Sequence, residues 1–337
     1  MHRLAFALVA TACVLVAGSY VAYATLYGSG SDTSDRVVPE ARATLERLGV
    51  DATYVVFQNA TRDDDYARIA LASKNLPRRR IIAGRACERV YFASARALCL
   101  VPVQGSVYFQ FAYEAVILDR GLEQRGQVEL PGIISRARIS PDGRYGATTG
   151  FVTGHSYRDK GFSTYTALID MNAGSKITDL ERFTVTRDGK TIRSPDFNFW
   201  GVTFTRKAGE FYATLGTGGH TYLVRGDIAS MRVDVLRDGV ECPSLSPDGT
   251  RLAFKQRAGS EGGSPRWRPA VLDLATLEDH PLAETRNVDD QIEWLDDDTV
   301  LYSVSDREPS MWAAPADGGG QPRLFLSDGA SPAVVRP

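Results

Sequence analysis

Several features that usually point to a function are scarce in this sequence. Its 337 residues include 4 cysteines, 4 histidines and 4 tryptophans, and the formal net charge is -2. Arginine and acidic residues are interleaved along the chain, which argues against a nucleic-acid surface because such a surface needs a concentrated basic face. The hydrophobic fraction of 43% is enough to bury a large core, and nothing suggests disorder. We therefore expect a folded protein that does not bind nucleic acid.

An uncharged apolar run extends from Leu4 to Leu26. At about 1.5 Å per residue it is long enough to cross a bilayer of roughly 30 Å. The small-x-small pattern Ala22-Tyr23-Ala24 is typical of a signal-peptidase site. Residues 1–27 are therefore predicted to be a cleaved signal peptide or an uncleaved signal anchor, and both alternatives stay open. Either one places the rest of the chain outside the cytoplasm, secreted or anchored to the cytoplasmic membrane.

Residues 28–50 are predicted to be a linker followed by a short helix. Gly, Ser and Asp dominate the beginning of this segment, a composition that tethers a domain flexibly. The stretch Pro39–Leu48 then has a proline at the helix start, an early acid and two leucines on one face, with Gly49 as a stop signal. Residues 51–337 show period-two alternation broken by turn residues and no convincing long amphipathic helix, which predicts an all-β domain.

A short β-hairpin motif occurs twice in this domain. Ser246-Pro247-Asp248-Gly249 joins two alternating runs, and Ser140-Pro141-Asp142-Gly143 does the same. The proline sets φ for the second turn position, the aspartate can bond the backbone ahead of it, and the glycine tolerates the positive φ that closes the turn. Positions equivalent to Ser246 recur 41 to 65 residues apart, at Phe92, Ser140, Thr205, Ser246 and Leu295. This spacing is typical of four-stranded propeller blades, one of which carries an insertion.

A second feature repeats in phase with the hairpins. The third strand of a blade ends in an aspartate followed by a polar or glycine turn, at Asp119, Asp170, Asp273 and, more loosely, Asp227. The first blade lacks an inner strand, and residues 328–335 look like an inner strand without a blade. Pairing the two closes the ring and removes open sheet edges. The predicted fold is an all-β, six-bladed β-propeller closed by the C-terminal strand and preceded by the signal or anchor helix and the short helix.

The two motif hairpins carry a family resemblance. ISPDGRYGAT (residues 139–148) and LSPDGTRLAF (residues 245–254), followed in phase by LIDMNAG and VLDLATL, resemble the repeat of TolB-like six-bladed β-propellers. The same repeat occurs in propellers attached to prolyl-oligopeptidase-type peptidases, whose Gly-x-Ser-x-Gly elbow this sequence does not contain. The resemblance implies a binding or scaffolding propeller of the cell envelope and transfers no catalytic residue.

Cysteine positions suggest one disulfide. Cys87 and Cys99 flank a predicted hairpin in an extracytoplasmic domain, where disulfides persist. A bridge requires Cα atoms about 4.4 to 6.8 Å apart, and the alternative is two small buried thiols on adjacent strands. Cys242, on an inner strand, is expected to pack as a small apolar residue.

Candidate binding residues fall in the loops that join second and third strands, in the insertion of blade four and on the inner strand that follows it. His155 and His220 sit in similar local contexts in neighbouring blades, which suggests a shared site for a metal or an anion; two histidines are too few for a metal site, so no metal is predicted. The insertion Thr184–Asp196 and the other long loops are expected on the same face. The predicted binding residues are His155, Tyr157, Arg158, Arg193, Asn198, Trp200, His220 and Trp267.

The sequence supports several functional hypotheses. The leading one is a non-enzymatic propeller that binds a protein or a cell-envelope component, with no catalytic residue and no cofactor. The alternatives are an enzyme acting on glycans at the channel mouth and a small-ligand sensor that acts through the anchor. An enzyme of that kind needs clustered histidines and carboxylates, whereas the inner strands offer mostly Arg136, Arg138, Asn198 and Asp290. Two aspartate runs, 63–65 and 296–298, lack the interleaved spacing of a calcium loop and are expected to be turns.

Overall fold

The computed structural model describes residues 37–103, 112–159, 161–305 and 308–337. The predicted signal or anchor segment, residues 1–27, lies outside these ranges. Within them, no helix is both long and apolar enough to cross a membrane.

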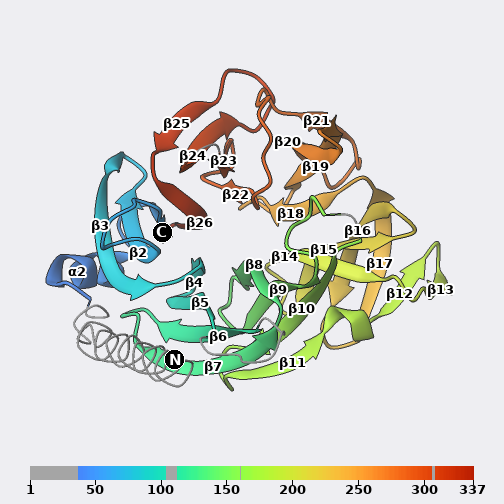
Figure 1. The fold of residues 1–337 in the computed structure, drawn as a ribbon, viewed down its shortest axis with the longest axis horizontal. Helices are drawn as coiled ribbons and strands as arrows, with labels where there is room; N and C mark the ends of the chain where they lie inside the picture. Colours follow the sequence, from blue (N-terminus) through green and yellow to red (C-terminus); the bar gives the residue numbers. More distant parts are fainter. Residues whose placement is uncertain (1–36, 104–111, 160, 306–307) are drawn as a thin grey trace, which may run out of the picture. The chain divides into compact units, whose positions relative to one another are not determined.

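Residues 37–337 form one compact unit, in which six sheets are arranged around a common centre (Figure 1). The strands of blade one are β26 (Gly329–Val335), β1 (Tyr54–Asn59), β2 (Arg68–Ser73) and β3 (Leu76–Ala86). Blade two contains β4 (Arg89–Ala93), β5 (Arg96–Pro102), β6 (Ala112–Asp119) and β7 (Gln124–Pro131). Blade three contains β8 (Ile133–Ile139), β9 (Tyr145–Thr153), β10 (Ser163–Asp170) and β11 (Ser175–Asp179).

The second half of the ring follows the same order. Blade four contains β14 (Asn198–Phe204), β15 (Glu210–Thr217), β16 (His220–Asp227) and β17 (Arg232–Asp238), and on its outer side β12 (Thr184–Arg187) and β13 (Lys190–Ile192). Blade five contains β18 (Glu241–Leu245), β19 (Arg251–Glu261), β20 (Ser264–Asp273) and β21 (Asp279–Pro281). Blade six contains β22 (Glu293–Trp294), β23 (Thr299–Ser305), β24 (Pro309–Pro315) and β25 (Arg323–Leu326). The predicted six-bladed propeller is confirmed.

The last strand closes the ring, as the missing inner strand of blade one predicts. β26 pairs antiparallel with β1, with Tyr54 opposite Val335 and Asn59 opposite Gly329. Blade one is therefore assembled from both ends of the domain, and β1 has a hydrogen-bonded neighbour on each side. This arrangement removes an open sheet edge that would otherwise be available for aggregation.

The core lies between the blades. Each pair of neighbouring sheets shares a cluster of fully or almost fully buried apolar side chains, including the pair formed by blades six and one. At that last seam Phe57 of blade one packs with Leu301 of blade six, both with no exposed surface. The alternating runs of the sequence thus supply both faces of every sheet with apolar side chains, because a blade is covered on both sides by its neighbours.

The repeated hairpins have the local chemistry that their sequence predicts. In both Ser-Pro-Asp-Gly turns the serine hydroxyl donates to the aspartate Oδ1 at 2.5 Å and accepts the N–H five residues later at 2.9 Å. Gly143 and Gly249 have φ of 71° and 78°, which favours glycine. The two aspartate runs are turns as well, since Asp63 and Asp296 each accept the N–H two residues later.

The insertion in blade four is a strand pair instead of the predicted loop. β12 pairs parallel with β17 and antiparallel with β13, so the sheet of blade four has six strands. Val185 is buried in the core shared by blades three and four, which anchors the hairpin. Only the end of the insertion reaches the β15–β16 turn, where the Asp196 carboxylate accepts hydrogen bonds from Thr217 and Gly218. Burial of its apolar face is the physical reason that this segment joins the sheet.

The short helix and the cysteines complete the fold. The predicted helix is α2 (Pro39–Arg47), whose Leu45 is buried in the core of blades one and two, and a 3-10 turn, η1 (Leu180–Arg182), links blades three and four. Cys87 and Cys99 form a disulfide with Cα atoms 5.4 Å apart. Cys242 is fully buried, as expected for a small apolar residue.

Candidate functional site

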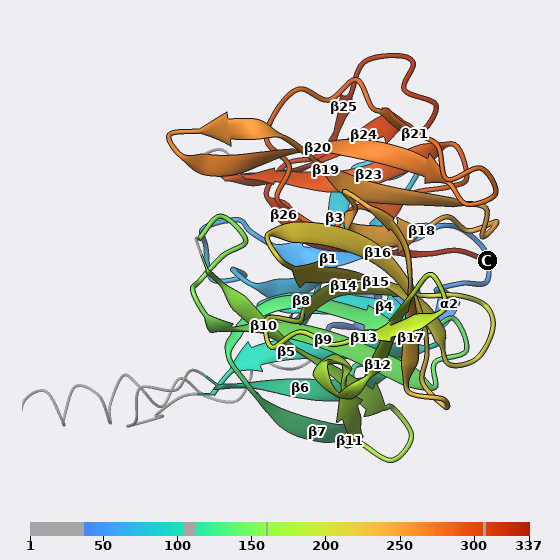
Figure 2. The ribbon, with the colours of Figure 1, turned by 90° about the vertical axis from the view of Figure 1, so that its right-hand side faces the viewer.

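The propeller has two faces. We call the face that carries the connections between first and second strands the turn face, and the one that carries the connections between second and third strands the loop face. The long β19–β20 hairpin projects on the loop face, and the C-terminus lies on the opposite side of the molecule (Figure 2). Sequence reasoning places the site on the loop face.

Two arginines of blade three reach across the propeller axis to blade six. Arg136 donates from Nη2 to the carbonyl of Asp289 at 2.7 Å, and its Nη1 lies 3.7 Å from the Asp290 carboxylate. Arg138 donates from Nη2 to the carbonyl of Ile292 at 3.0 Å and lies 3.5 Å from Glu293 Oε2. Blades three and six are opposite one another in a ring of six, so these side chains span the centre and separate the two faces.

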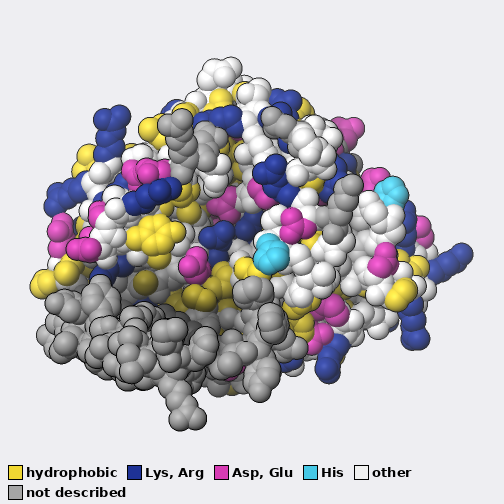
Figure 3. All heavy atoms as spheres, in the orientation of Figure 1, with side chains coloured by type: hydrophobic (Ala, Val, Ile, Leu, Met, Phe, Trp, Pro, Cys, Tyr) yellow, Lys and Arg dark blue, Asp and Glu magenta, His cyan; other side chains and the backbone are white. Residues whose placement is uncertain are grey.

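On the loop face, charged side chains of both signs gather around a central hollow (Figure 3). Lys255 has no exposed surface, and its Nζ lies 2.7 Å from Asp289 and 4.4 Å from the ring centres of Tyr157 and Trp267. Burial by itself lowers the pKa of Lys255, but Asp289, Cys242 and Glu241 together outweigh it, and the pKa lies above its ordinary value. Lys255 is therefore a permanent cation enclosed by aromatic rings and an acid.

Four predicted binding residues of the loop face are structural. Tyr157, Trp200 and Trp267 are buried in one aromatic cluster, with exposures of 3%, 2% and 0%. The amide of Asn198 accepts two hydrogen bonds from Thr164 and donates to the carbonyl of Phe162, which ties blade four to blade three. The three aromatic side chains have little surface to offer a ligand, although the indole Nε1 atoms of Trp200 and Trp267 have no acceptor among the described residues.

The other four predicted residues are exposed. Asp159 accepts hydrogen bonds from the backbone of His155, and Arg158 lies in the same turn. His220 faces Thr217 at the β15–β16 turn, and Arg193 follows β13 on the outer sheet of blade four. Among the described residues no group of three or more His, Cys, Asp or Glu is placed to hold a metal.

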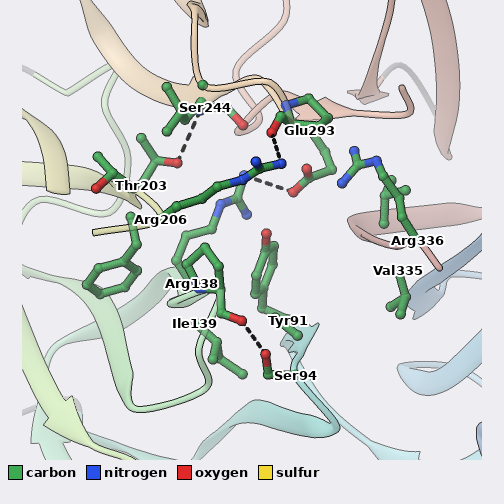
Figure 4. A pocket seen from close by; sticks show the side chains of 18 of the residues that line it. Tyr91, Ser94, Arg138, Ile139, Thr203, Arg206, Ser244, Glu293, Val335 and Arg336 are labelled. Atoms are coloured by element: carbon green, nitrogen blue, oxygen red, sulfur yellow. Dashed lines mark hydrogen bonds and ion pairs between the residues drawn. The ribbon is translucent and has the colours of Figure 1, made fainter. Parts of the chain in front are cut away.

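A well-formed cavity lies on the turn face, where the sequence suggested only turns. It has a volume of about 810 Å³ and is lined by residues of all six blades. Its walls include the Ser246–Gly249 turn, Pro141 and Ser94, and Arg138 and Glu293 form its floor (Figure 4). The repeated turns thus serve as walls of a pocket in addition to closing the hairpins.

The charge of this cavity differs from that of the whole chain. Its lining contains six basic and three acidic side chains, namely Arg120, Arg138, Arg206, Lys207, Arg225 and Arg336, and Glu210, Asp248 and Glu293. Three of the guanidinium groups bind backbone carbonyls: Arg206 donates to Pro247, Arg336 to Trp294, and Arg120 to the C-terminal end of α2. A backbone carbonyl accepts hydrogen bonds but carries no net charge, so it does not neutralise the guanidinium groups. These three arginines therefore contribute positive potential to the cavity.

The acids of the cavity are held in structural contacts. Partial burial opposes the ionisation of Glu210, but Arg225, 2.7 Å away, and Lys207, 3.4 Å away, lower its pKa. Burial opposes the ionisation of Asp248 as well, but the Ser246 hydroxyl and the Thr250 N–H lower its pKa to about 2. These two carboxylates are therefore ionised at neutral pH and poorly suited to donate protons.

The sequence analysis did not predict this site, because it interpreted the residues around the repeated turns only as turn-forming residues. Arg206 and Lys207 sit at the blade-four turn equivalent to Ser-Pro-Asp-Gly, and Arg138 lies just before the blade-three turn. A surplus of basic residues around equivalent turns, counted over the blades, would have pointed to the turn face.

Comparisons with known proteins support the architecture. No protein-family model matches the chain, and no curated protein matches its sequence. TolB from Acinetobacter baumannii is similar in structure, with a TM-score of 0.58, 14% identity, and coverage of 88% of this chain and 71% of TolB. The chain has a TolB-like six-bladed β-propeller fold. A chain of a nidogen/laminin complex is also similar to this TolB-like propeller, with a TM-score of 0.51, 10% identity, and coverage of 84% of this chain and 98% of that one. Likenesses at such low identity show the fold and leave function to the site.

Proposed function

We propose that this TolB-like propeller is a non-enzymatic binding protein that holds a segment of a partner protein in the turn-face cavity. The observation that carries the proposal is the cavity itself: about 810 Å³ in volume, with walls supplied by all six blades. Its size lies in the usual range for ligand sites, and rigid strands and short turns form its lining. The fold is thus preorganised at this point, which lowers the cost of binding.

The chemistry of the lining favours binding over catalysis. Glu210 and Asp248 have lowered pKa values, and Glu293 lies against Arg138. General acid–base catalysis needs a group that exchanges protons near neutral pH, and these carboxylates are committed to ion pairs and turn hydrogen bonds. The arginines, in contrast, can form bidentate contacts with carboxylates or carbonyls of a partner.

We propose further that the protein works outside the cytoplasm. The Cys87–Cys99 disulfide and the apolar run at residues 4 to 26 support this location, since disulfides persist in oxidising compartments. Fractionation of cells that produce the full chain, with alkylation of free thiols, tests the idea. Two alkylated thiols at Cys87 and Cys99 in the cytoplasmic fraction would contradict it.

Site-specific photo-crosslinking in producing cells tests the binding role. A photoreactive amino acid replaces Ser94, which is exposed and lines the cavity, and in a matched control it replaces His220, which is exposed on the loop face. We expect a discrete protein adduct from the Ser94 position that disappears when Arg206→Glu is added. Adducts from the His220 position alone, or none from either position, would overturn the proposal.

A further inference from the structure

Resting on that proposed function, we infer that the partner segment held in the turn-face cavity is acidic, with carboxylates on the cavity rim and an uncharged residue over Glu293. The inference concerns the kind of partner that this surface fits. It follows from the positions of the charged side chains around the cavity and from the buried carboxylate of Glu293 on its floor.

The cations lie on opposite sides of the cavity. Arg206, Lys207 and Arg225 come from blade four, whereas Arg336 follows β26 of blade one, on the other side of the ring. Arg206 and Arg336 extend from opposite sides towards Glu293 (Figure 4). An extended segment laid across the cavity would therefore meet a guanidinium group at each end.

The excess of positive charge is local and is not cancelled within the cavity. The lining carries six basic and three acidic side chains, although the whole chain has a formal net charge of -2. Both Lys207 and Arg225 share the single carboxylate of Glu210, and Arg206 and Arg336 donate to backbone carbonyls. Acidic side chains of a partner supply the missing charge, which speeds association and selects against basic partners.

The floor requires a different group. Glu293 is 5% exposed, its Oε2 lies 3.5 Å from Arg138, and its carboxylate also faces Tyr91 of the cavity lining, whose pKa its charge and hydrogen bond help to raise. A second carboxylate placed beside this buried one is repelled. An uncharged residue therefore fits over Glu293, with acidic neighbours that reach the rim.

A protein segment fits better than an anionic polysaccharide or a nucleic acid. Apolar side chains also line the cavity, among them Ile139, Phe204 and Val335. A peptide can cover them with its own apolar atoms while its carboxylates reach the arginines. A sugar chain or phosphate backbone offers charge and hydroxyl groups but leaves these side chains without apolar contacts.

A display experiment with a library of random linear peptides tests the inference on the purified protein. The library is selected on the unchanged protein and on three variants: Arg206→Glu, Arg206→Gln, and the control Arg193→Glu. Arg193 is exposed on the outer side of the same blade and does not line the cavity. Thermal melting verifies that all four proteins are folded, and labelled heparin serves as the polyanion probe.

We expect enriched peptides in which acidic residues flank an uncharged residue. Their affinity should fall at least about tenfold in Arg206→Glu, less in Arg206→Gln and not at all in Arg193→Glu, and it should weaken with added salt. Enriched peptides that are basic or purely apolar, or that bind Arg206→Glu equally well, would overturn the acidic segment. If no peptide is enriched and heparin binds the unchanged protein but not Arg206→Glu, the cavity binds a polyanion and not an acidic peptide segment. If no probe binds while the Ser94 crosslink forms, this inference fails and the proposed function stands; if both fail, the proposed function fails as well.

Discussion

Arg138 on β8 and Glu293 on β22, from opposite blades of the ring, approach to 3.5 Å across the propeller axis, with exposures of 7% and 5%. This ion pair is the floor of the turn-face cavity. Arg138 also stacks over Tyr91, with its guanidinium carbon 4.5 Å from the ring centre, and burial together with the Glu293 charge raises the pKa of Tyr91. The pair thus joins blades two, three and six at the centre of the ring.

Replacing one member of this ion pair should lower the free energy of unfolding more than replacing both members with apolar residues. Glu293→Leu leaves a buried guanidinium without its carboxylate, and we expect a loss of about 3 kcal/mol in the free energy of unfolding. The double variant Arg138→Met, Glu293→Leu should recover more than half of that loss, because apolar side chains replace a desolvated pair. Urea unfolding of both single variants and the double variant measures the coupling. Additive losses would show that the two residues do not depend on one another.

Deleting Ser327–Pro337 should leave the protein insoluble or unfolded. The deletion removes β26, exposes the hydrogen-bonding edge of β1 and uncovers Phe57, which packs in the seam between blades one and six. Soluble yield and the melting curve of the purified chain measure the effect. Removal of Pro337 alone, which leaves β26 intact, is the matched control. A truncated chain with an unchanged melting temperature would contradict ring closure by β26.

Loss of the disulfide should destabilise the domain. Cys87 and Cys99 are 12 residues apart, and closing a loop of that length contributes about 3 kcal/mol in the chain-entropy model. The double variant Cys87→Ala, Cys99→Ala should unfold at lower urea concentration, and the unchanged protein should shift by a similar amount in reductant. The double variant itself should not respond to reductant. A reductant response in that variant would implicate another group.

Glu181 should make the stability depend on pH near neutrality. Both its carboxylate oxygens are buried between blades three and four, and burial, with a further contribution from Asp179, raises its pKa from 4.5 to about 7. Because the folded state holds this proton more tightly, the contribution of Glu181 to stability is largest below pH 4.5, falls as the pH rises to about 7, and then levels off. The total loss is about 3 kcal/mol at most.

The variant Glu181→Gln removes that ionisation. It should unfold at higher urea concentration than the unchanged protein at about pH 8, with the difference closing at about pH 4. Glu46→Gln, at an exposed position on α2, is the matched control and should follow the unchanged protein at both pH values. An equal pH dependence in Glu181→Gln would show that folding does not shift the pKa of Glu181.

The hairpin motifs were predictable because their chemistry is local. In the Ser246–Gly249 turn, the hydroxyl, the carboxylate and the glycine act within six residues of one another, so the sequence alone gives the blade phase. The blade boundaries also show that blade one lacks its first strand in the sequence, which predicts that β26 supplies it. The structure confirms that β26 pairs with β1. The Cys87–Cys99 disulfide is one of the two alternatives that the sequence left open, and the structure has it.

The insertion and the binding residues were harder to place. A four-residue strand such as β12 carries no distinctive pattern, and its pairing with β17 depends on Val185 finding space in a core built by two blades. Tyr157, Trp200 and Trp267 resemble ligand-binding aromatics in a sequence, yet the structure buries them in one cluster, with Tyr157 and Trp267 against Lys255. Burial in a propeller depends on the neighbouring blade, which the local sequence does not contain.

The sequence by itself thus determined the number of blades, their boundaries and the way in which the ring closes, because turn residues and alternation act over a few positions. Tertiary structure alone decided that Arg138 meets Glu293, 155 residues further along the chain, and that Arg206 and Arg336 face one cavity. These relations depend on closing the ring, which brings opposite blades to a common axis and concentrates charge that is evenly spread along the chain.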